Sequence, residues 1–494
     1  MNIFTRALPA KKQVAIYFGG TIIRQLTGFI MLPIYTSYLT PADYGVVGLL
    51  VTTLTIIELL FGARFSQALP KFYFENKSKK YRQTLISTAL ISSILVSFVF
   101  YLSVKPFNQE ISTLLYGSTK YASLIGIYLI SLITVGIEAY GTTYLRIKEW
   151  PILFAASSIM KLLVQLSLNI YLIVFAGIGV YGIIISSVLS SAIFAFIYSV
   201  IIFYSTSIKF DFQIFKSLVK FSWPLWLAGL GALYISSVSR ISINYFSSLT
   251  DLGLFELASK FAGILPLLIW GPFGQWWNTE RFKIFNSDDK GGETFNTVFN
   301  RISFVFVLAA MGLSLFYEPA IRLMADPAYF TSTKAIVPLT YGVVLNSLLN
   351  FFLFSFLVTS KTICTTGIRY FSALIISVLL YWLVPIYGFV GASYSIFLTN
   401  VAAIFVGQFW SKKYFDNKIK LRYISAALPV SAVFIYLDQY ASSLTESLVV
   451  HLILDTTFML LGALSVFLIF KRFINLKQVL AFISSSIRSR MKLK

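Results

Sequence analysis

Cysteine and histidine are nearly missing from this sequence of 494 residues, which has one of each, Cys364 and His451. A single cysteine excludes an internal disulfide and a metal site built from several thiolates. A single histidine argues against histidine-based catalysis and against a histidine metal cluster. Long polar insertions are missing too, since the largest predicted loop covers only about residues 280–301. Membrane glycosyltransferases and polymerases usually carry a sizeable loop or domain, so these features favour a protein without covalent chemistry.

Charge is scarce as well, because only 12% of the residues are charged whereas 57% are hydrophobic. A soluble domain has roughly 25% charged residues. The sequence therefore predicts an all-α, polytopic membrane protein, since about 20 apolar residues cross a bilayer as one helix. About fourteen apolar spans are expected, at 14–38, 44–68, 84–104, 121–145, 151–175, 178–204, 221–247, 252–279, 302–320, 335–359, 370–385, 387–410, 423–440 and 447–470.

The distribution of Lys and Arg gives the orientation of these spans. With the N-terminus placed in the cytoplasm, 31 of the 40 basic residues fall in cytoplasmic segments and four on the opposite side. Such an excess is the positive-inside pattern, and it places both termini in the cytoplasm. The net charge of +21 is then explained by topology and by attraction to anionic lipid headgroups, so no nucleic-acid partner is expected.

Two similar stretches suggest an internal duplication. An arginine-bearing span precedes Asp43-Tyr44-Gly45, and a second one precedes Asp251-Leu252-Gly253. Transporters are often built from such repeats. We therefore predict two pseudo-symmetric six-helix lobes at 1–215 and 216–411, an extra helix pair at 412–470, and a basic cytoplasmic tail at 471–494. Pro224, Pro266 and Gly271-Pro272 predict breaks in the seventh and eighth spans, which are tolerated where backbone lines a cavity.

The ionisable residues inside the spans are the candidate functional residues, because charge in a bilayer is costly and usually functional. Arg24 stands near the middle of the first span, with glycine and threonine as its i±3 and i±4 neighbours. Glu256 and Lys260 are interpreted mainly as an i,i+4 pair. His451 and Asp455 have the same spacing and resemble an acyltransferase signature, which we interpret as coincidence.

Four cations inside the predicted spans have no acid one helical turn away: Arg24, Arg64, Lys161 and Arg240. Two acids, Glu58 and Glu138, likewise have no basic residue one turn away. This balance predicts a positively charged interior that suits a phosphate or pyrophosphate, since arginine binds phosphate in a bidentate manner. The alternative is an interhelical ion pair for each, for example between Arg64 and Glu138. The candidate substrate-binding residues are Arg24, Arg64, Lys161, Arg240, Asn244 and Lys260.

Several motifs resemble the polysaccharide-export branch (Wzx type) of the multidrug/oligosaccharidyl-lipid/polysaccharide (MOP) flippase superfamily. They are the arginine-bearing first helix, Leu39-Thr40-Pro41-Ala42-Asp43-Tyr44-Gly45, Gly62-Ala63-Arg64, Leu69-Pro70-Lys71-Phe72-Tyr73-Phe74-Glu75, Phe221-Ser222-Trp223-Pro224-Leu225 and Asp251-Leu252-Gly253. The resemblance implies a flippase of the bacterial cytoplasmic (inner) membrane that moves undecaprenyl-pyrophosphate-linked oligosaccharides for O-antigen or capsule assembly. It implies a cationic cavity at Arg24, with Arg64 and Arg240 as further members, and alternating access between two lobes.

Three other functions stay open at this stage: a lipid II flippase, a cation-coupled drug exporter and a membrane polysaccharide polymerase or ligase. No cofactor is expected, although H⁺ or Na⁺ could drive transport through Glu58 or Glu138. The expected partners are the lipid-linked oligosaccharide and membrane lipids, together with a polysaccharide polymerase and a chain-length regulator.

Overall fold

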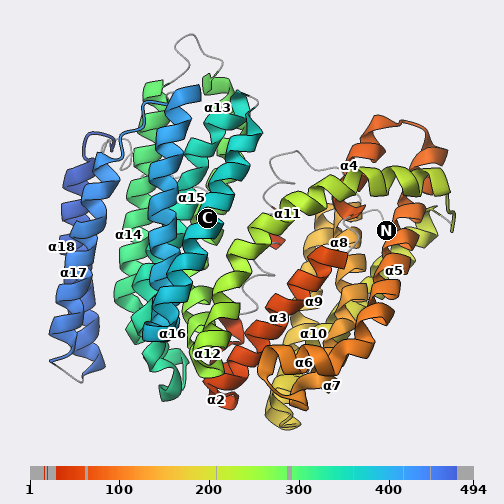
Figure 1. The fold of residues 1–494 in the computed structure, drawn as a ribbon, viewed down its shortest axis with the longest axis horizontal. Helices are drawn as coiled ribbons and strands as arrows, with labels where there is room; N and C mark the ends of the chain where they lie inside the picture. Colours follow the sequence, from red (N-terminus) through yellow and green to blue (C-terminus); the bar gives the residue numbers. More distant parts are fainter. Residues whose placement is uncertain are drawn as a thin grey trace, which may run out of the picture. The chain divides into compact units, whose positions relative to one another are not determined.

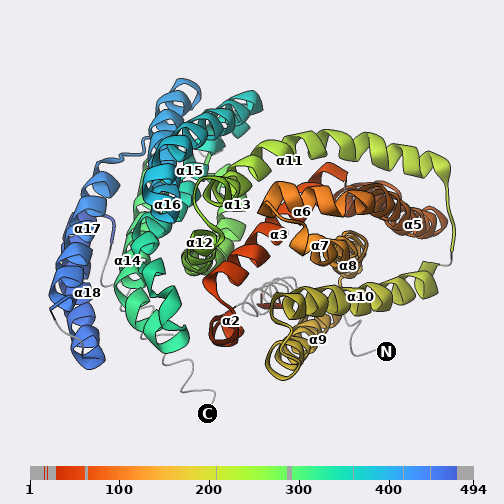
Figure 2. The ribbon, with the colours of Figure 1, turned by 60° about the horizontal axis from the view of Figure 1, so that its bottom comes forward.

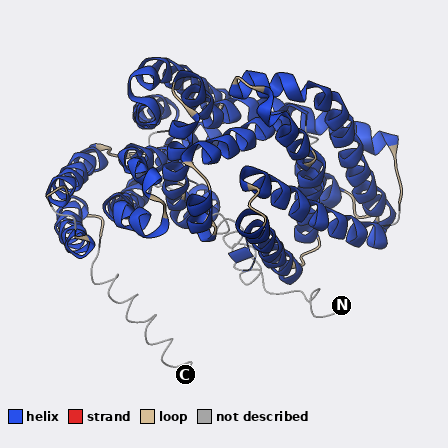
Figure 3. Ribbon diagram, turned by 90° about the horizontal axis from the view of Figure 1, so that it is seen from below, coloured by secondary structure: helices blue, strands red, loops and turns tan. Residues whose placement is uncertain are grey.

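The computed structural model describes residues 16, 19–20, 29–61, 65–206, 208–285, 292–359, 361–415, 417–444 and 447–474. In this part of the chain every regular element is helical (Figure 3). The first ten described helices are α2 (Leu32–Tyr38), α3 (Pro41–Phe61), α4 (Phe65–Glu75), α5 (Lys79–Val104), α6 (Asn108–Tyr116), α7 (Ala122–Leu129), α8 (Ser131–Ile147), α9 (Pro151–Ile170), α10 (Gly179–Thr206) and α11 (Phe212–Phe246). They are followed by α12 (Leu249–Ala262), α13 (Gly271–Phe285), α14 (Gly292–Met324), α15 (Thr333–Val358), α16 (Thr362–Tyr414), α17 (Arg422–Ser442) and α18 (Leu448–Phe470).

Eleven helical stretches in the described residues are long and apolar enough to cross a membrane. One of them, Ile363–Tyr414, holds two of the predicted spans, because Gly388 interrupts the helix with a left-handed φ of 55°. The span predicted at 221–247 falls within α11, and most of the first predicted span lies outside the described residues. The all-α polytopic fold is thus confirmed, whereas the count of fourteen and the side of the termini stay predictions.

The helix breaks predicted in the seventh and eighth spans have different outcomes in the structure. Pro266 begins a π-helical turn, Pro266–Trp270, that separates α12 from α13, so the eighth span is broken where its proline and glycine residues stand. By contrast, α11 continues through Pro224. A π turn leaves backbone groups without their usual partners in the same helix and often marks a functional position.

The described chain divides into two compact units. Unit 1 comprises the residues up to Glu256, together with Met324–Tyr329 and Ser377–Ala392. In it α8 packs against both α5 and α10 (Figures 1 and 2). The buried hydroxyl of Tyr140 on α8 donates to the carbonyl oxygen of Ile86 on α5 at 2.8 Å. This bond gives the α5–α8 contact a fixed register within an otherwise apolar core.

Unit 2 comprises Leu257–Leu323, Phe330–Ile376 and the described residues from Ser393 onward. Its core is aromatic: Trp277 and Phe351 are completely buried with ring centroids 4.9 Å apart, and Phe295 stacks on Phe354 at 5.5 Å. The last two helices, α17 and α18, lie side by side (blue in Figure 1). The division into lobes at residue 215 and a separate helix pair stays a prediction.

The outward side chains are apolar, which agrees with a lipid-facing surface. On α18, for example, Leu460, Leu464 and Leu468 are 67%, 57% and 55% exposed. Soluble proteins rarely expose contiguous apolar patches of this kind. The surface is therefore that of a protein embedded in a bilayer.

Candidate functional site

Helices α3 and α12 begin with the same capping arrangement. The hydroxyl of Thr40 accepts a hydrogen bond from the backbone N–H of Asp43 at 3.2 Å, and Ser248 does the same for Asp251 at 3.0 Å. The Asp43 carboxylate in turn accepts from the backbone N–H of Thr40 at 3.1 Å. Each bond satisfies an N–H that the first helical turn leaves free. The two Asp-x-Gly motifs are therefore helix starts of the same design.

The glycines of these motifs cross in direct backbone contact. A Cβ added to Gly45 would lie 2.0 Å from the carbonyl oxygen of Leu249, and one added to Gly253 would lie 1.8 Å from that of Pro41. The backbone nitrogen of each glycine lies 3.1 Å from the position that a Cβ on the other glycine would take. The contacts are reciprocal, since Pro41 and Leu249 each stand four residues before the glycine of their own helix. This is the contact expected where two copies of a duplicated motif meet.

Arg240 on α11 forms an ion pair with Glu256 on α12. Its Nε donates to Glu256, its Nη2 lies 3.3 Å from Glu256 Oε2, and its Nη1 donates to the carbonyl oxygen of Ser236 at 2.7 Å. Gly48 on α3 makes room for this acid, because a Cβ there would lie 2.6 Å from Glu256 Cγ. These three contacts use three of the five N–H donors of a guanidinium, and the Arg240 side chain is 27% exposed.

Lys161 on α9 has a partner of its own, since its Nζ forms an ion pair with Glu138 on α8 and lies 3.3 Å from the hydroxyl of Ser191 on α10. The side chains of Lys161 and Glu138 are only 16% and 10% exposed. The pair therefore ties three helices of unit 1 together at a position that water scarcely reaches. Breaking such a pair leaves an uncompensated charge in a medium of low dielectric constant.

The predicted substrate residues are thus placed in different ways. Asn244 donates its side-chain amide to the carbonyl oxygen of Leu115 at 2.6 Å, which links α11 to the end of α6. Lys260 and Glu58 lie on α12 and α3, and each takes part in further polar contacts. Arg24 and Arg64 lie outside the described residues. Lys161 and Arg240 follow the alternative that the sequence left open, which is an interhelical ion pair.

Residues that the sequence reasoning missed also lie in membrane-spanning helices. Asp438 on α17 is 4% exposed, and it faces Asp455 of α18, which is 2% exposed. Equal spacing from the connection would not have paired them, because Asp438 lies four residues before the end of α17 and Asp455 lies seven residues after the start of α18. In the described part of the chain, no group of three or more His, Cys, Asp or Glu side chains could hold a metal ion.

Comparison with known proteins gives the family. Residues 10–276 match the family described as polysaccharide biosynthesis protein, which is more than half of the chain. The chain therefore belongs to this family. A search of curated proteins found no match.

Solved structures share the fold. A lipid II flippase, MurJ, in an inward closed conformation has a TM-score of 0.72 at 16% identity, covering 93% of this chain and 99% of that one. An inward-facing multidrug resistance MATE transporter of the MOP superfamily has a TM-score of 0.63 at 16% identity, covering 79% and 97%. Both likenesses show a shared fold, and the eleven apolar helical stretches of the described residues make this chain a multi-pass membrane protein.

Proposed function

We propose that this protein is a flippase that moves undecaprenyl-pyrophosphate-linked oligosaccharide units across the bacterial cytoplasmic membrane for O-antigen or capsule assembly. The observation that carries the proposal is the match of residues 10–276 to the polysaccharide biosynthesis family, in a chain whose fold is that of a lipid-carrier flippase. Such transport makes and breaks no covalent bond in the substrate. It requires a group that compensates the pyrophosphate charge within the membrane and a change of access between the two sides.

Arginine side chains serve the pyrophosphate in this proposal. Arg24, Arg64 and Arg240 carry guanidinium groups, which bind phosphate oxygens in a bidentate manner. Arg240 contributes even though it is paired, because its contacts with Glu256 and Ser236 leave two of its N–H donors for a ligand and its side chain is partly exposed. Glu256 would then hold the guanidinium in place between substrates. Lys161 is the weaker candidate, since Glu138 covers it in a buried pair.

A second candidate is a flippase for lipid II, favoured by the likeness over nearly the whole chain to such a protein. Lipid II and the repeat-unit carrier share the undecaprenyl-pyrophosphate part and differ in the sugars. The same cationic residues would therefore serve either substrate. The two functions are separated by supplying each lipid in turn to reconstituted vesicles.

Loss of the arginine in the first span is expected to abolish transport. In vesicles loaded with undecaprenyl-pyrophosphate oligosaccharide on one side, Arg24→Ala should lower the translocation rate at least about tenfold, since ~1.4 kcal/mol of lost phosphate binding has that effect. Arg24→Lys keeps the charge and should retain part of the rate. Exposure of the sugar on the far side is measured with a membrane-impermeant lectin or glycosidase.

The exposed Lys283, which pairs only with Glu280 one turn away, supplies the matched control as Lys283→Ala and should transport normally. Activity in wild type that neither Arg24 variant changes would keep the flippase and remove Arg24 from substrate binding. Translocation of lipid II, without translocation of the oligosaccharide carrier, would support the second candidate, a flippase for lipid II.

Proton coupling through the buried acid of α8 makes a further prediction. If Glu138 releases Lys161 when it takes up a proton, transport by Glu138→Gln should proceed at a rate that no longer responds to a pH gradient. The measurement compares rates with and without the gradient in wild type, Glu138→Gln and Glu58→Gln. An unchanged response in both variants would show that neither acid couples transport to protons.

A further inference from the structure

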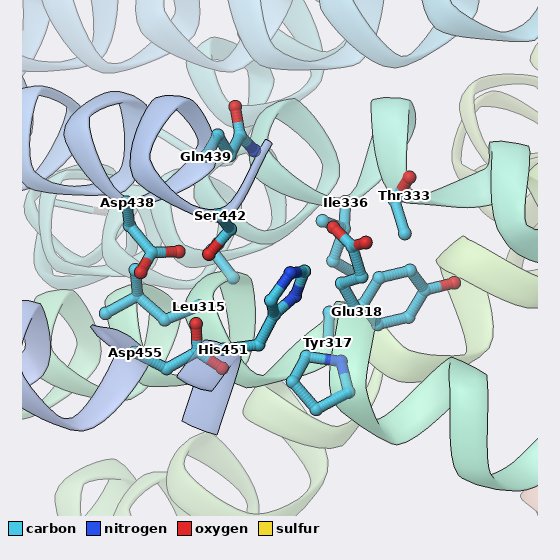
Figure 4. A pocket seen from close by; sticks show the side chains of 12 residues that line it. Leu315, Tyr317, Glu318, Thr333, Ile336, Asp438, Gln439, Ser442, His451 and Asp455 are labelled. Atoms are coloured by element: carbon cyan, nitrogen blue, oxygen red, sulfur yellow. The ribbon is translucent and has the colours of Figure 1, made fainter. Parts of the chain in front are cut away.

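Two buried carboxyl groups face each other in the last helix pair, apart from every residue proposed for substrate binding or ion coupling. Asp438 of α17 and Asp455 of α18 are within hydrogen-bonding range of each other. Asp438 stands four residues before the end of α17 at Ser442, and Asp455 stands seven residues after the start of α18 at Leu448. Figure 4 shows both carboxyl groups on the same side of a pocket formed by α14, α15, α17 and α18.

In the part of the chain that the structure describes, one carboxyl oxygen of each aspartate lacks a hydrogen-bond donor. Among the described residues, Asp438 Oδ1 and Asp455 Oδ2 are buried and have no hydrogen-bond partner, and the same holds for the hydroxyl oxygen of Ser442, which lines the same pocket. Ionised carboxylates are acceptors only, so contact between the two becomes a hydrogen bond only when one of them carries a proton. Two adjacent carboxylates in a site of low dielectric constant cannot both stay ionised.

The cavity beside the pair is small and polar. Its volume of about 20 Å³ is room for a single water molecule, which needs about 10–15 Å³. The unpartnered hydroxyl of Ser442, 8% exposed, gives such a water a hydrogen-bonding partner besides the two carboxyl oxygens.

Other ionisable groups surround the pair. His451, one turn before Asp455 on α18, is 5% exposed, and on α14 Glu318 is held by Arg322 with an Nη2–Oε1 distance of 2.8 Å. Tyr317 on α14 donates to or accepts from Ser332 at 3.0 Å. The lining residues of α15, Thr333 and Ile336, do not titrate. His451, Glu318 and Tyr317 are thus the ionisable side chains that line the pocket together with the pair.

We propose that Asp438 and Asp455 form a proton-binding site in the α17–α18 pair that takes up and releases one proton. The protonated pair is hydrogen-bonded and joins the two helices, whereas loss of the proton places two like charges in contact and weakens their packing. This inference concerns the helix pair itself and does not depend on the transported substrate.

The experiment measures thermal unfolding of the full-length protein in detergent, from mildly acidic to mildly alkaline buffers. Wild type should melt at progressively lower temperature as the pH rises, because the pair loses its shared proton. Asp438→Asn replaces the proton by an amide that donates to Asp455 at every pH, so its melting temperature should stay level over the same range. Asp455→Asn should behave in the same way. Infrared spectra should show a protonated-carboxyl band in wild type that both variants lack.

Two further measurements keep the proposal falsifiable. His451→Gln should retain the pH dependence of wild type; if it melts at a constant temperature and Asp438→Asn does not, the histidine is the titrating group and the proposal is wrong. Replacing K⁺ by Na⁺ at constant ionic strength should leave every melting temperature unchanged. If Na⁺ raised the melting temperature of wild type and not that of Asp438→Asn, the pair would be a sodium site and the proposal of a proton site would be wrong.

Discussion

Gly253→Ala is expected to damage this protein more than any conservative change elsewhere in its helices. The added methyl group would lie 1.8 Å from the carbonyl oxygen of Pro41, and Gly45→Ala would place one 2.0 Å from that of Leu249. Since both obstacles are backbone atoms, no side chain can rotate away and the two helices must separate. Overpacking of this kind costs about 1–3 kcal/mol or more. Thermal unfolding in detergent and the yield of monodisperse protein measure the effect.

Gly136→Ala on α8 provides the matched control. A methyl group there would meet only the hydroxyl of Ser97, at an ordinary contact distance of 3.5 Å. Alanine also favours a helix over glycine by about 1 kcal/mol, so this variant should melt at or above the temperature of wild type. If Gly253→Ala and Gly45→Ala melted like Gly136→Ala, the two helices would not cross as closely as the structure has them.

The capping turns illustrate how far the sequence leads. Asp43-Tyr44-Gly45 and Asp251-Leu252-Gly253 are visible in the sequence as a repeated helix start, because capping is a local interaction between residues three apart. Their mutual contact is not visible, since it joins segments about two hundred residues apart and depends on how the helices between them pack. The apolar spans were predicted well for the same local reason. The boundary inside α16 depends on a special backbone angle, at Gly388.

The sequence left interhelical ion pairs open for Arg240 and Lys161 without naming their partners, because spacing within one helix identifies only acids one helical turn away. Arg240 and Glu256 stand eight residues before and after Ser248, at the turn between α11 and α12, and Glu138 and Lys161 stand 11 and 12 residues from Glu149, between α8 and α9. In an antiparallel hairpin, residues equally far from the turn lie at the same depth. Applied to the intramembrane charges, this rule would have paired both, whereas Asp438 and Asp455 lie at unequal distances from the ends of their helices.

Neutralising the Arg240–Glu256 pair one side at a time is expected to reduce stability sharply. Removing one partner of a buried ion pair costs about 3–5 kcal/mol, because the other charge is left uncompensated. The lower end applies here, since the Arg240 side chain is 27% exposed. Arg240→Gln and Glu256→Gln should each lower the melting temperature, and the double variant should lose less than the sum of the two. Such non-additivity is the signature of a direct interaction.

Transport separates a structural pair from a substrate-binding one. If Arg240 contacts the pyrophosphate, the double variant regains stability but still transports poorly, whereas Glu256→Gln keeps the guanidinium and transports at a rate closer to wild type. Neutralising the exposed pair Lys283–Glu280 should change stability by less than about 1 kcal/mol and leave transport intact. Normal transport by the double variant would leave Arg240 with a purely structural role, and the charge that meets the substrate would then have to come from Arg24 and Arg64.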